Sequence, residues 1–215
     1  YKMTSLIGRI LGIEKGTDEY VKAIQKTIEK NGIAVSLEEV AADEKSLWVA
    51  YSLTDENDEN DISMNSVQAA VDGEALALER QYALNNSTGS EKTASKYFVA
   101  KFNRSKADRS QKFEIEIGTF QNENGQVEEK DAYEFSFTAD PEVLEADTKE
   151  IDIQTSIPIE KNQTFLLSEM KYNIFGCTIS GSFSDMAEDD EFWLRGKDDL
   201  GNEYVFDLTS YEKPN

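Results

Sequence analysis

Oxygen-bearing side chains recur at every second position from Asp55 to Asp61, which makes this stretch the one best suited to binding a cation. Carboxylate and amide oxygens are the ligands that calcium prefers. An EF-hand loop also requires Gly at its sixth position and a bidentate Glu at its twelfth. Counted from Asp55, those positions hold Asn60 and Ser66. We therefore expect a solvated acidic loop, with calcium binding here or in Asp185–Glu191 as the alternative.

Paired carboxylates are a second possible source of chemistry, because glycoside hydrolases use two acids roughly 5–9.5 Å apart. The chain has 43 acidic residues, so such pairs arise by chance. Glu38-Glu39, Glu114 with Glu116, and Glu188–Glu191 are the obvious examples. We expect each to be a hydrated strand face or turn, and a glycan hydrolase built on two carboxylates stays as an alternative function.

The remaining inventory predicts a protein that is not an enzyme. The chain contains no His, which removes Ser-His-Asp and Cys-His arrangements and His-ligated zinc. Its only cysteine is Cys177, close to Phe175 and Ile179, and we expect a small core residue rather than a nucleophile. Glycine-rich phosphate-binding motifs are absent. We therefore assign no catalytic, cofactor-binding or metal-binding residues and expect no cofactor.

The charge of the chain limits its partners. The 215 residues include 43 acidic against 22 basic side chains, a formal net charge of -21. Such a chain repels phosphate backbones and anionic lipid surfaces, so we expect neither nucleic-acid binding nor membrane contact by this fragment. An acidic composition most often indicates a solvated surface. Binding of a cationic partner is the more specific alternative.

The start of the chain suggests a fragment of a longer protein. The sequence begins with Tyr1 rather than Met, and no signal peptide is visible. Its longest apolar run is far shorter than the roughly 20 residues that span a bilayer. We therefore expect a membrane anchor upstream of Tyr1.

Alternating apolar residues predict the strands that organise the fold. Ile33–Leu37 and Leu47–Leu53 each give one oily and one wetter face, and the turn 42–46 joins them as an antiparallel pair. The Asn31-Gly32 and Asp72-Gly73 dipeptides predict tight turns, the second within a hairpin over residues 62–84. Further strands are predicted around Phe98–Phe102, Phe113–Ile117 and Tyr133–Phe137, with hairpin-length connections at 103–110 and 122–125.

These patterns predict a mainly β protein with a defined domain order. A short helix at 4–12, with a cap at Thr4 or Ser5 and an end at Gly12, belongs to an N-terminal segment 1–19. An antiparallel β-sandwich, immunoglobulin-like in the loose sense, follows over 20–140. A linker at 141–150 precedes a second, smaller β domain at 151–215. Its strands are predicted at Ile151–Ile153 (with a break at Pro158), Phe165–Leu167, Tyr172–Ile174, Thr178–Phe183, Phe192–Leu194 and Tyr204–Leu208.

Large aromatic residues are expected to pack rather than to bind sugars. Trp48, Trp193 and Tyr204 lie on or next to predicted strands. Buried aromatic rings supply much of the apolar area of a core or an interface. We therefore interpret the three as core or interface residues.

Three stretches of strand and turn carry a resemblance to known proteins. They are Asn31-Gly32-Ile33, the Asp43 turn before Leu47-Trp48-Val49, and the turn 199–202 before Tyr204. Over most of residues 20–210 this order resembles a family of bacterial extracytoplasmic domains of unknown function. In that family a cytoplasmic segment and one transmembrane helix precede the β-rich region, and some members accompany extracytoplasmic-function sigma factors. The resemblance implies a β-rich, membrane-anchored protein and no catalytic residues.

We therefore predict a non-catalytic interaction or sensing module in the extracytoplasmic part of a membrane-anchored bacterial protein. The resemblance adds a link to sigma-factor regulation. The expected partner is an unknown protein or a cell-envelope component, bound by the sandwich loops or by a strand added to an exposed sheet edge. A calcium-dependent surface or adhesion module is the first alternative, and the glycan hydrolase is the second.

Overall fold

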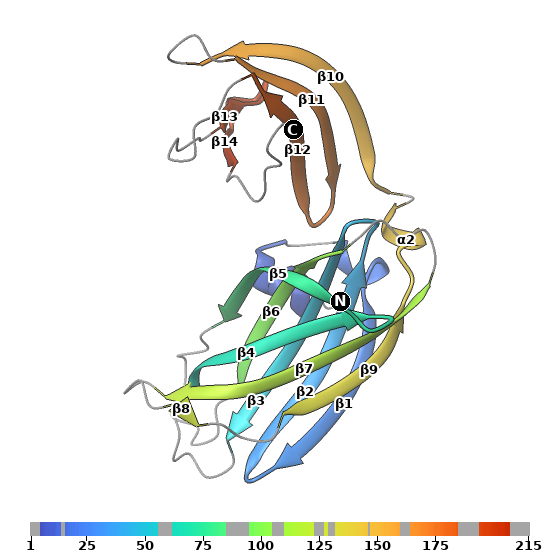
Figure 1. Ribbon diagram of the computed structural model, residues 1–215, viewed down its shortest axis with the longest axis vertical. Coiled ribbons are helices and arrows are strands. Elements are labelled where there is room, and N and C mark those ends of the chain that lie inside the picture. Colours follow the sequence, from blue (N-terminus) through green and yellow to red (C-terminus); the bar gives the residue numbers. More distant parts are fainter. Residues whose placement is uncertain are drawn as a thin grey trace. The chain divides into compact units, whose positions relative to one another are not determined.

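A computed structural model describes residues 5–13, 16–55, 62–84, 95–104, 110–122, 127–128, 132–145, 147–159, 164–184 and 194–206. These residues form a mainly β protein with antiparallel strand pairing (Figure 1), as the sequence predicts. The chain divides into two compact units, Tyr1–Asp147 and Thr148–Asn215. The division falls inside the segment 141–150.

The described residues of the first unit form a nine-stranded sheet. Its order is β1-β2-β3-β6-β5-β4-β7, and β8 and β9 both pair with the far side of β7. The strands are β1 Lys22–Lys30, β2 Ile33–Ala42, β3 Ser46–Asp55, β4 Ile62–Val71, β5 Glu74–Leu84, β6 Lys96–Asn103, β7 Gln111–Asn122, β8 Val127–Glu128 and β9 Tyr133–Ala139.

The β4–β5 hairpin folds this sheet into two layers. Its turn is Asp72-Gly73, with φ of 50° and 85°, as the dipeptide predicts. β4 and β5 pair only next to the turn, at Ala69–Val71 with Glu74–Leu76. Beyond it β4 pairs with β7 whereas β5 pairs with β6. The predicted sandwich therefore forms from a single bent sheet.

The prediction of a hairpin-length connection at 103–110 is wrong. β6 pairs with β3 and β5, whereas β7 pairs with β4, β8 and β9. The two strands therefore lie in different layers, and residues 103–110 carry the chain from one layer to the other. Length and polarity alone do not distinguish such a crossing from a hairpin turn.

The core of the first unit lies between the two layers. Val35 and Leu37 from β2, and Val49 from β3, are fully buried, as their alternation predicts. Phe113, Ile115 and the ring of Phe135 close the core from the second layer; they are among the core residues of β7 and β9. Each buried side chain of this size contributes roughly 1.5–3 kcal/mol, so this layer contact stabilises the unit.

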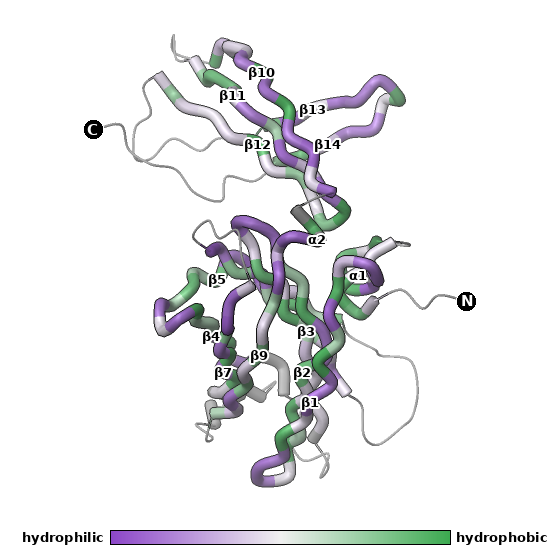
Figure 2. Tube along the Cα trace, turned by 90° about the vertical axis from the view of Figure 1, so that its right-hand side faces the viewer, coloured by the Kyte–Doolittle hydropathy of each residue, from purple (hydrophilic) through white to green (hydrophobic). Residues whose placement is uncertain are grey.

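The helix α1, Leu6–Leu11, covers the outer face of the first layer. The hydroxyl of Ser5 accepts a hydrogen bond from Gly8 N, and Gly12 ends the helix with φ of 75°, as the sequence predicts. The helix contacts β2, β3, β5 and β6. Figure 2 shows α1 on the side of β2 and β3 that faces away from β4 and β7. Trp48 and Ala50, which alternate with the inward-facing residues of β3, are buried as well. The alternation of apolar residues does not predict that a helix covers this second face of the strand.

Two short helical turns form at positions where the sequence predicted no helix. Thr17–Glu19 forms a 3-10 turn, and α2, Glu142–Glu145, stands within the predicted linker. Leu144 of α2 is 1% exposed. The predicted linker therefore contains a buried side chain.

Within the second unit, the described residues form two small sheets. β10 Lys149–Pro158, β11 Thr164–Asn173 and β12 Gly176–Phe183 form a three-stranded antiparallel sheet in that order. β13 Leu194–Lys197 and β14 Glu203–Phe206 form a two-stranded hairpin. Pro158 ends an edge strand, as predicted.

Two predictions for the second unit are wrong. Phe165–Leu167 and Tyr172–Ile174 are not separate strands, because β11 runs through both regions and ends at Asn173. A register shift between Leu167 and Glu169 breaks the alternation and hides the continuity. Cys177 is exposed rather than in the core. It lies on β12, which has a described neighbour on one side alone.

Candidate functional site

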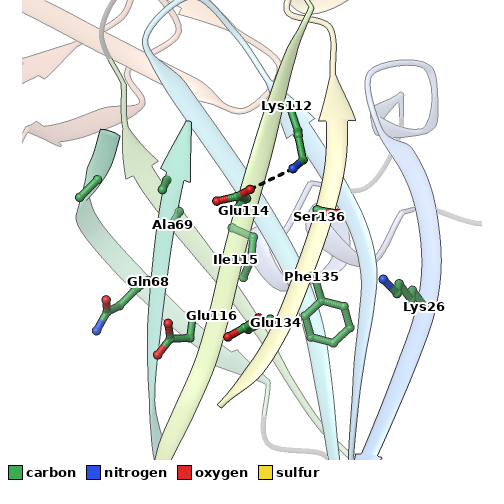
Figure 3. A pocket seen from close by; sticks show the side chains of 12 residues that line it. Lys26, Gln68, Ala69, Lys112, Glu114, Ile115, Glu116, Glu134, Phe135 and Ser136 are labelled. Carbon is green, nitrogen blue, oxygen red and sulfur yellow. Dashed lines mark hydrogen bonds and ion pairs between the residues drawn. The ribbon is translucent and has the colours of Figure 1, made fainter. Parts of the chain in front are cut away.

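A hollow of about 500 Å³ lies on the outer face of β4, β7 and β9. Figure 3 shows its side chains along the three strands, with Lys26 of β1 at one side. Small residues, including Ala70 and Ser136, leave room between the longer side chains. The complete lining is Lys26, Gln68, Ala69, Ala70, Ala75, Lys112, Glu114, Ile115, Glu116, Glu134, Phe135 and Ser136.

Strand pairing brings the carboxylates of this hollow together. Glu116 of β7 stands directly opposite Glu134 of β9 and, on its other side, opposite Gln68 of β4. Glu114 stands between Ala70 and Ser136. The three Glu residues are exposed, so the hollow presents a row of carboxylates to solvent.

The charges on this face are not balanced within the described part of the chain. Lys112 Nζ lies 3.0 Å from Glu114 Oε1, but both side chains are more than half exposed, and such a pair contributes little to stability. Glu116 and Glu134 make no ion pair with any residue that the structure describes. Like charges directly opposite on a sheet destabilise it. The facing carboxylates of Glu116 and Glu134 therefore repel each other.

Lysine side chains, rather than backbone hydrogen bonds, span the seam between β1 and β9 beside the hollow. Lys22 Nζ donates to Thr138 O at 2.8 Å, and Lys30 Nζ donates to Ala132 O at 2.5 Å. Lys26 Nζ lies 6.0 Å from the ring centroid of Phe135. These three lysines cover the edge of β9 with positive charge.

The carboxylates of Glu38 and Glu39 bind different partners. Glu38 Oε1 accepts a hydrogen bond from Ser52 Oγ at 2.7 Å, whereas Glu39 Oε2 accepts from Ile7 N at 3.2 Å. Glu39 is half-buried rather than hydrated as predicted, because α1 covers it. Burial raises the pKa of Glu39, and the hydrogen bonds from the helix lower it in part. Its role is to hold α1 on β2.

Several predicted features fall outside the described residues. They are the side chains of Asp55–Asp61, the segment Asp185–Glu191 with its acids Glu188–Glu191, and Trp193. Among the residues that are described, no group of three or more His, Cys, Asp or Glu side chains is arranged to hold a metal ion. The calcium alternative stays a prediction.

Trp48 and Tyr204, two of the three aromatic residues predicted to pack in a core or an interface, are described and differ in their burial. Trp48 is buried, as expected. Tyr204 is 48% exposed, and its hydroxyl donates to Asp198 Oδ2 at 3.0 Å. The same carboxylate accepts from the side-chain amide of Asn202 and from the backbone N–H groups of Asn202 and Leu200. The hydrogen bond from the Asn202 side chain, with those from Asn202 N, Tyr204 and Leu200 N, lowers the pKa of Asp198. Tyr204 thus braces the β13–β14 turn instead of filling a core.

Sequence reasoning missed one buried cation. Arg104, directly after β6, is 6% exposed and has its guanidinium 5.1 Å from the ring centroid of Phe113. It donates through Nη2 to Gln111, whereas Nε and Nη1 have no hydrogen-bond partner among the described residues. Desolvation lowers the pKa of Arg104. An Arg after a strand gives no signal of burial in the sequence.

The fold and the hollow define a two-layered antiparallel β protein with an acidic strand face. Neither a protein-family model nor a curated protein sequence matches the chain. A solved structure, the crystal structure of a conserved domain protein from Bacillus anthracis, is similar with a TM-score of 0.56 at 18% identity. The similarity covers 77% of this chain and 58% of that chain. At this identity the likeness establishes the fold alone.

No helix in the described ranges is both long enough and apolar enough to cross a bilayer.

Proposed function

We propose that the chain is a non-catalytic interaction or sensing module that binds an extended, positively charged segment of a partner protein along the hollow of β4, β7 and β9. The observation that carries the proposal is the direct opposition of Glu116 and Glu134 without a counter-ion among the described residues. A Lys or Arg side chain placed between them would remove a repulsion that the free protein retains.

The net charge of -21 also favours binding of a positively charged segment. A strongly acidic surface attracts a basic segment over a long range and raises its association rate, and salt screens this attraction. The hollow adds specificity, because its carboxylates follow the two-residue period of a strand. An extended partner with a basic residue at every second position would match that spacing.

The experiment uses a defined probe, a peptide of alternating lysine and threonine, with an alternating glutamate and threonine peptide for comparison. We expect binding of the lysine peptide alone, with affinity falling as salt rises. The variant E116Q/E134Q should weaken binding about tenfold, which corresponds to about 1.4 kcal/mol. The control E29Q/E74Q removes the same charge from exposed positions outside the hollow and should bind as the unmodified chain does. An equal loss of affinity in both variants would show that the peptide binds the acidic surface in general rather than the hollow, and would overturn the proposal.

The extracytoplasmic, membrane-anchored location and the link to sigma factors remain part of this proposal and rest on the family resemblance. Cys177 offers a test, because it is the only cysteine of the chain and is exposed. In intact cells that make the natural full-length protein, a membrane-impermeant maleimide should label it. Mildly alkaline buffer favours the reaction, because partial desolvation raises the pKa of this solvent-accessible thiol. Labelling only after lysis, judged against a Cys177→Ser control, would contradict the location.

The facing pair Glu116 and Glu134 is also the observation that favours the second candidate, a carboxylate-based glycan hydrolase. A glycosidase acid needs surroundings that keep it protonated, usually an apolar site. Both carboxylates here are exposed to water, which supports the binding role. Glycan cleavage by the chain that E116Q or E134Q abolishes would establish the hydrolase instead.

A further inference from the structure

The outer edge of β12 differs from the other sheet edges that the structure describes. β12, with the sequence GCTISGSF, pairs with β11 on one side and with no described strand on the other. The strand contains neither a charged residue nor a proline. Alternate residues of a strand direct their N–H and C=O groups to opposite sides. Half of the backbone groups of β12 therefore point away from β11.

The other described edges carry the features that normally prevent pairing. Exposed edges are commonly protected by charged side chains, by proline or by bulges. Such residues are Lys22, Lys26 and Lys30 on β1, Glu134 on β9, Lys149, Asp152 and Pro158 on β10, Arg195 and Lys197 on β13, and Glu203 on β14. β8 is only two residues long, and very short edge strands are a further protection. β4 also lacks charged residues, and its residues 62–68 pair with β7 alone, but its register shifts at Ile62/Met64 and Asn65/Ser66 interrupt that side. β12 has eight successive uncharged positions and no inserted residue of its own, in a chain with 30% charged residues.

The strand is also accessible. Cys177, Thr178 and Ser182 of β12 are exposed. Beside them on β11, Tyr172 is opposite Cys177 and is 40% exposed. An uncharged edge that is open to solvent is a ready template for another strand.

We propose that β12 pairs in antiparallel fashion with β12 of a second copy of this chain, which joins the two three-stranded sheets across a twofold axis. The lack of charge favours a second copy of the chain as the partner. A twofold axis pairs the strand with an identical strand, so any charged residue near the axis would face a like charge. Pairing centred on Ser180 places Thr178 opposite Ser182 and brings no like charges together. Two copies of a chain with a charge of -21 repel each other least at such an edge. The proposal does not depend on the hollow of the first unit.

The test measures the mass of the purified chain over a concentration series by sedimentation equilibrium, in the presence of a reductant. We expect a reversible monomer–dimer equilibrium. The variant T178K/S182K sets lysines opposite each other across the axis and should be monomeric at concentrations at which the unmodified chain is dimeric.

Ser156 supplies a matched control. Ser156 of β10 and Ser182 of β12 are both exposed and flank Leu166 of β11 in the same register. Ser156→Lys therefore places a lysine beside the same neighbour, at the opposite edge, and should leave the dimer intact. Circular dichroism confirms that each variant is folded.

A chain that stays monomeric at its highest soluble concentration would overturn the proposal, and so would equal disruption by S156K. Cys177→Ser separates strand pairing from disulfide linkage. Its dimer should form as in the unmodified chain, and a dimer lost in this variant would also contradict β12 pairing.

Discussion

The phenol of Tyr133 on β9 reaches across the seam and donates to the carbonyl of Ile33 on β2 at 3.0 Å, and to that of Lys30 at 2.8 Å. Tyr133 is fully buried. The contact ties the last strand of the sheet to the β1–β2 hairpin, where Asn31-Gly32 makes the turn with φ of 52° and 76°. One hydroxyl thus helps to close an edge at which β1 and β9 do not pair.

Removal of this hydroxyl should weaken the first unit. Tyr133→Phe keeps the ring but leaves two carbonyl groups without this donor, one of them in a buried contact, at a cost of about 1–3 kcal/mol in the free energy of unfolding. Denaturant titration measures the change. Tyr82→Phe is the control, because the Tyr82 hydroxyl makes no hydrogen bond with the described residues. Equal stability of Y133F and Y82F would show that the seam does not depend on this contact.

Glu39 should make stability depend on pH. Desolvation raises its pKa in the folded chain, so the folded state binds a proton more tightly than the unfolded state does. Its contribution is therefore favourable at low pH and is lost as pH rises from the ordinary Glu value through the raised one. Glu39→Gln keeps an acceptor for Ile7 N without the charge. We expect E39Q to be at least as stable at neutral pH and to flatten the pH profile.

Thermal unfolding between mildly acidic and neutral pH tests the prediction for Glu39. Glu29→Gln is the control, because Glu29 is exposed on β1. A clear loss of stability in E39Q at neutral pH would mean that the carboxylate charge stabilises α1, which is the opposite of what the desolvation of Glu39 predicts.

Gly181 should tolerate no side chain. A Cβ built there would overlap the ring of Phe165 and lie 2.5 Å from the carbonyl oxygen of Leu166. Gly181→Ala should therefore destabilise the second unit by about 1–3 kcal/mol. Gly196→Ala is the comparison, because a Cβ there meets no atom within 4 Å. Proteolysis rates or unfolding of the unit would reveal the difference, and similar effects of both variants would argue against a close packing of Phe165 on β12.

Calcium provides a test of the adhesion alternative. A ligand specific for the folded state raises the apparent melting temperature. If Asp55–Asp61 or Asp185–Glu191 bound calcium, millimolar calcium would raise this temperature and a chelator would lower it. We expect neither change, since the first segment lacks the Gly and Glu of an EF-hand loop. A saturable rise with calcium, absent with magnesium, would restore the alternative.

The amino-acid sequence by itself determined the strands and many of their turns. Period-two alternation in Ile33–Leu37, Leu47–Leu53 and Phe113–Ile117 sets which side chains face the core, because successive residues of a strand point to opposite sides. Asn31-Gly32 and Asp72-Gly73 set tight turns, since these residues accept positive φ. The mainly β class followed from such local rules.

Only the tertiary structure decided which strands became neighbours. The opposition of Glu116 and Glu134 depends on the pairing of β7 with β9, and the open edge of β12 depends on the order β10-β11-β12. The burial of Trp48 required α1, and that of Arg104 required the end of the sandwich around it. Pairing and cover join residues distant in sequence, so no local periodicity encodes them, and both proposed interaction surfaces follow from these long-range contacts.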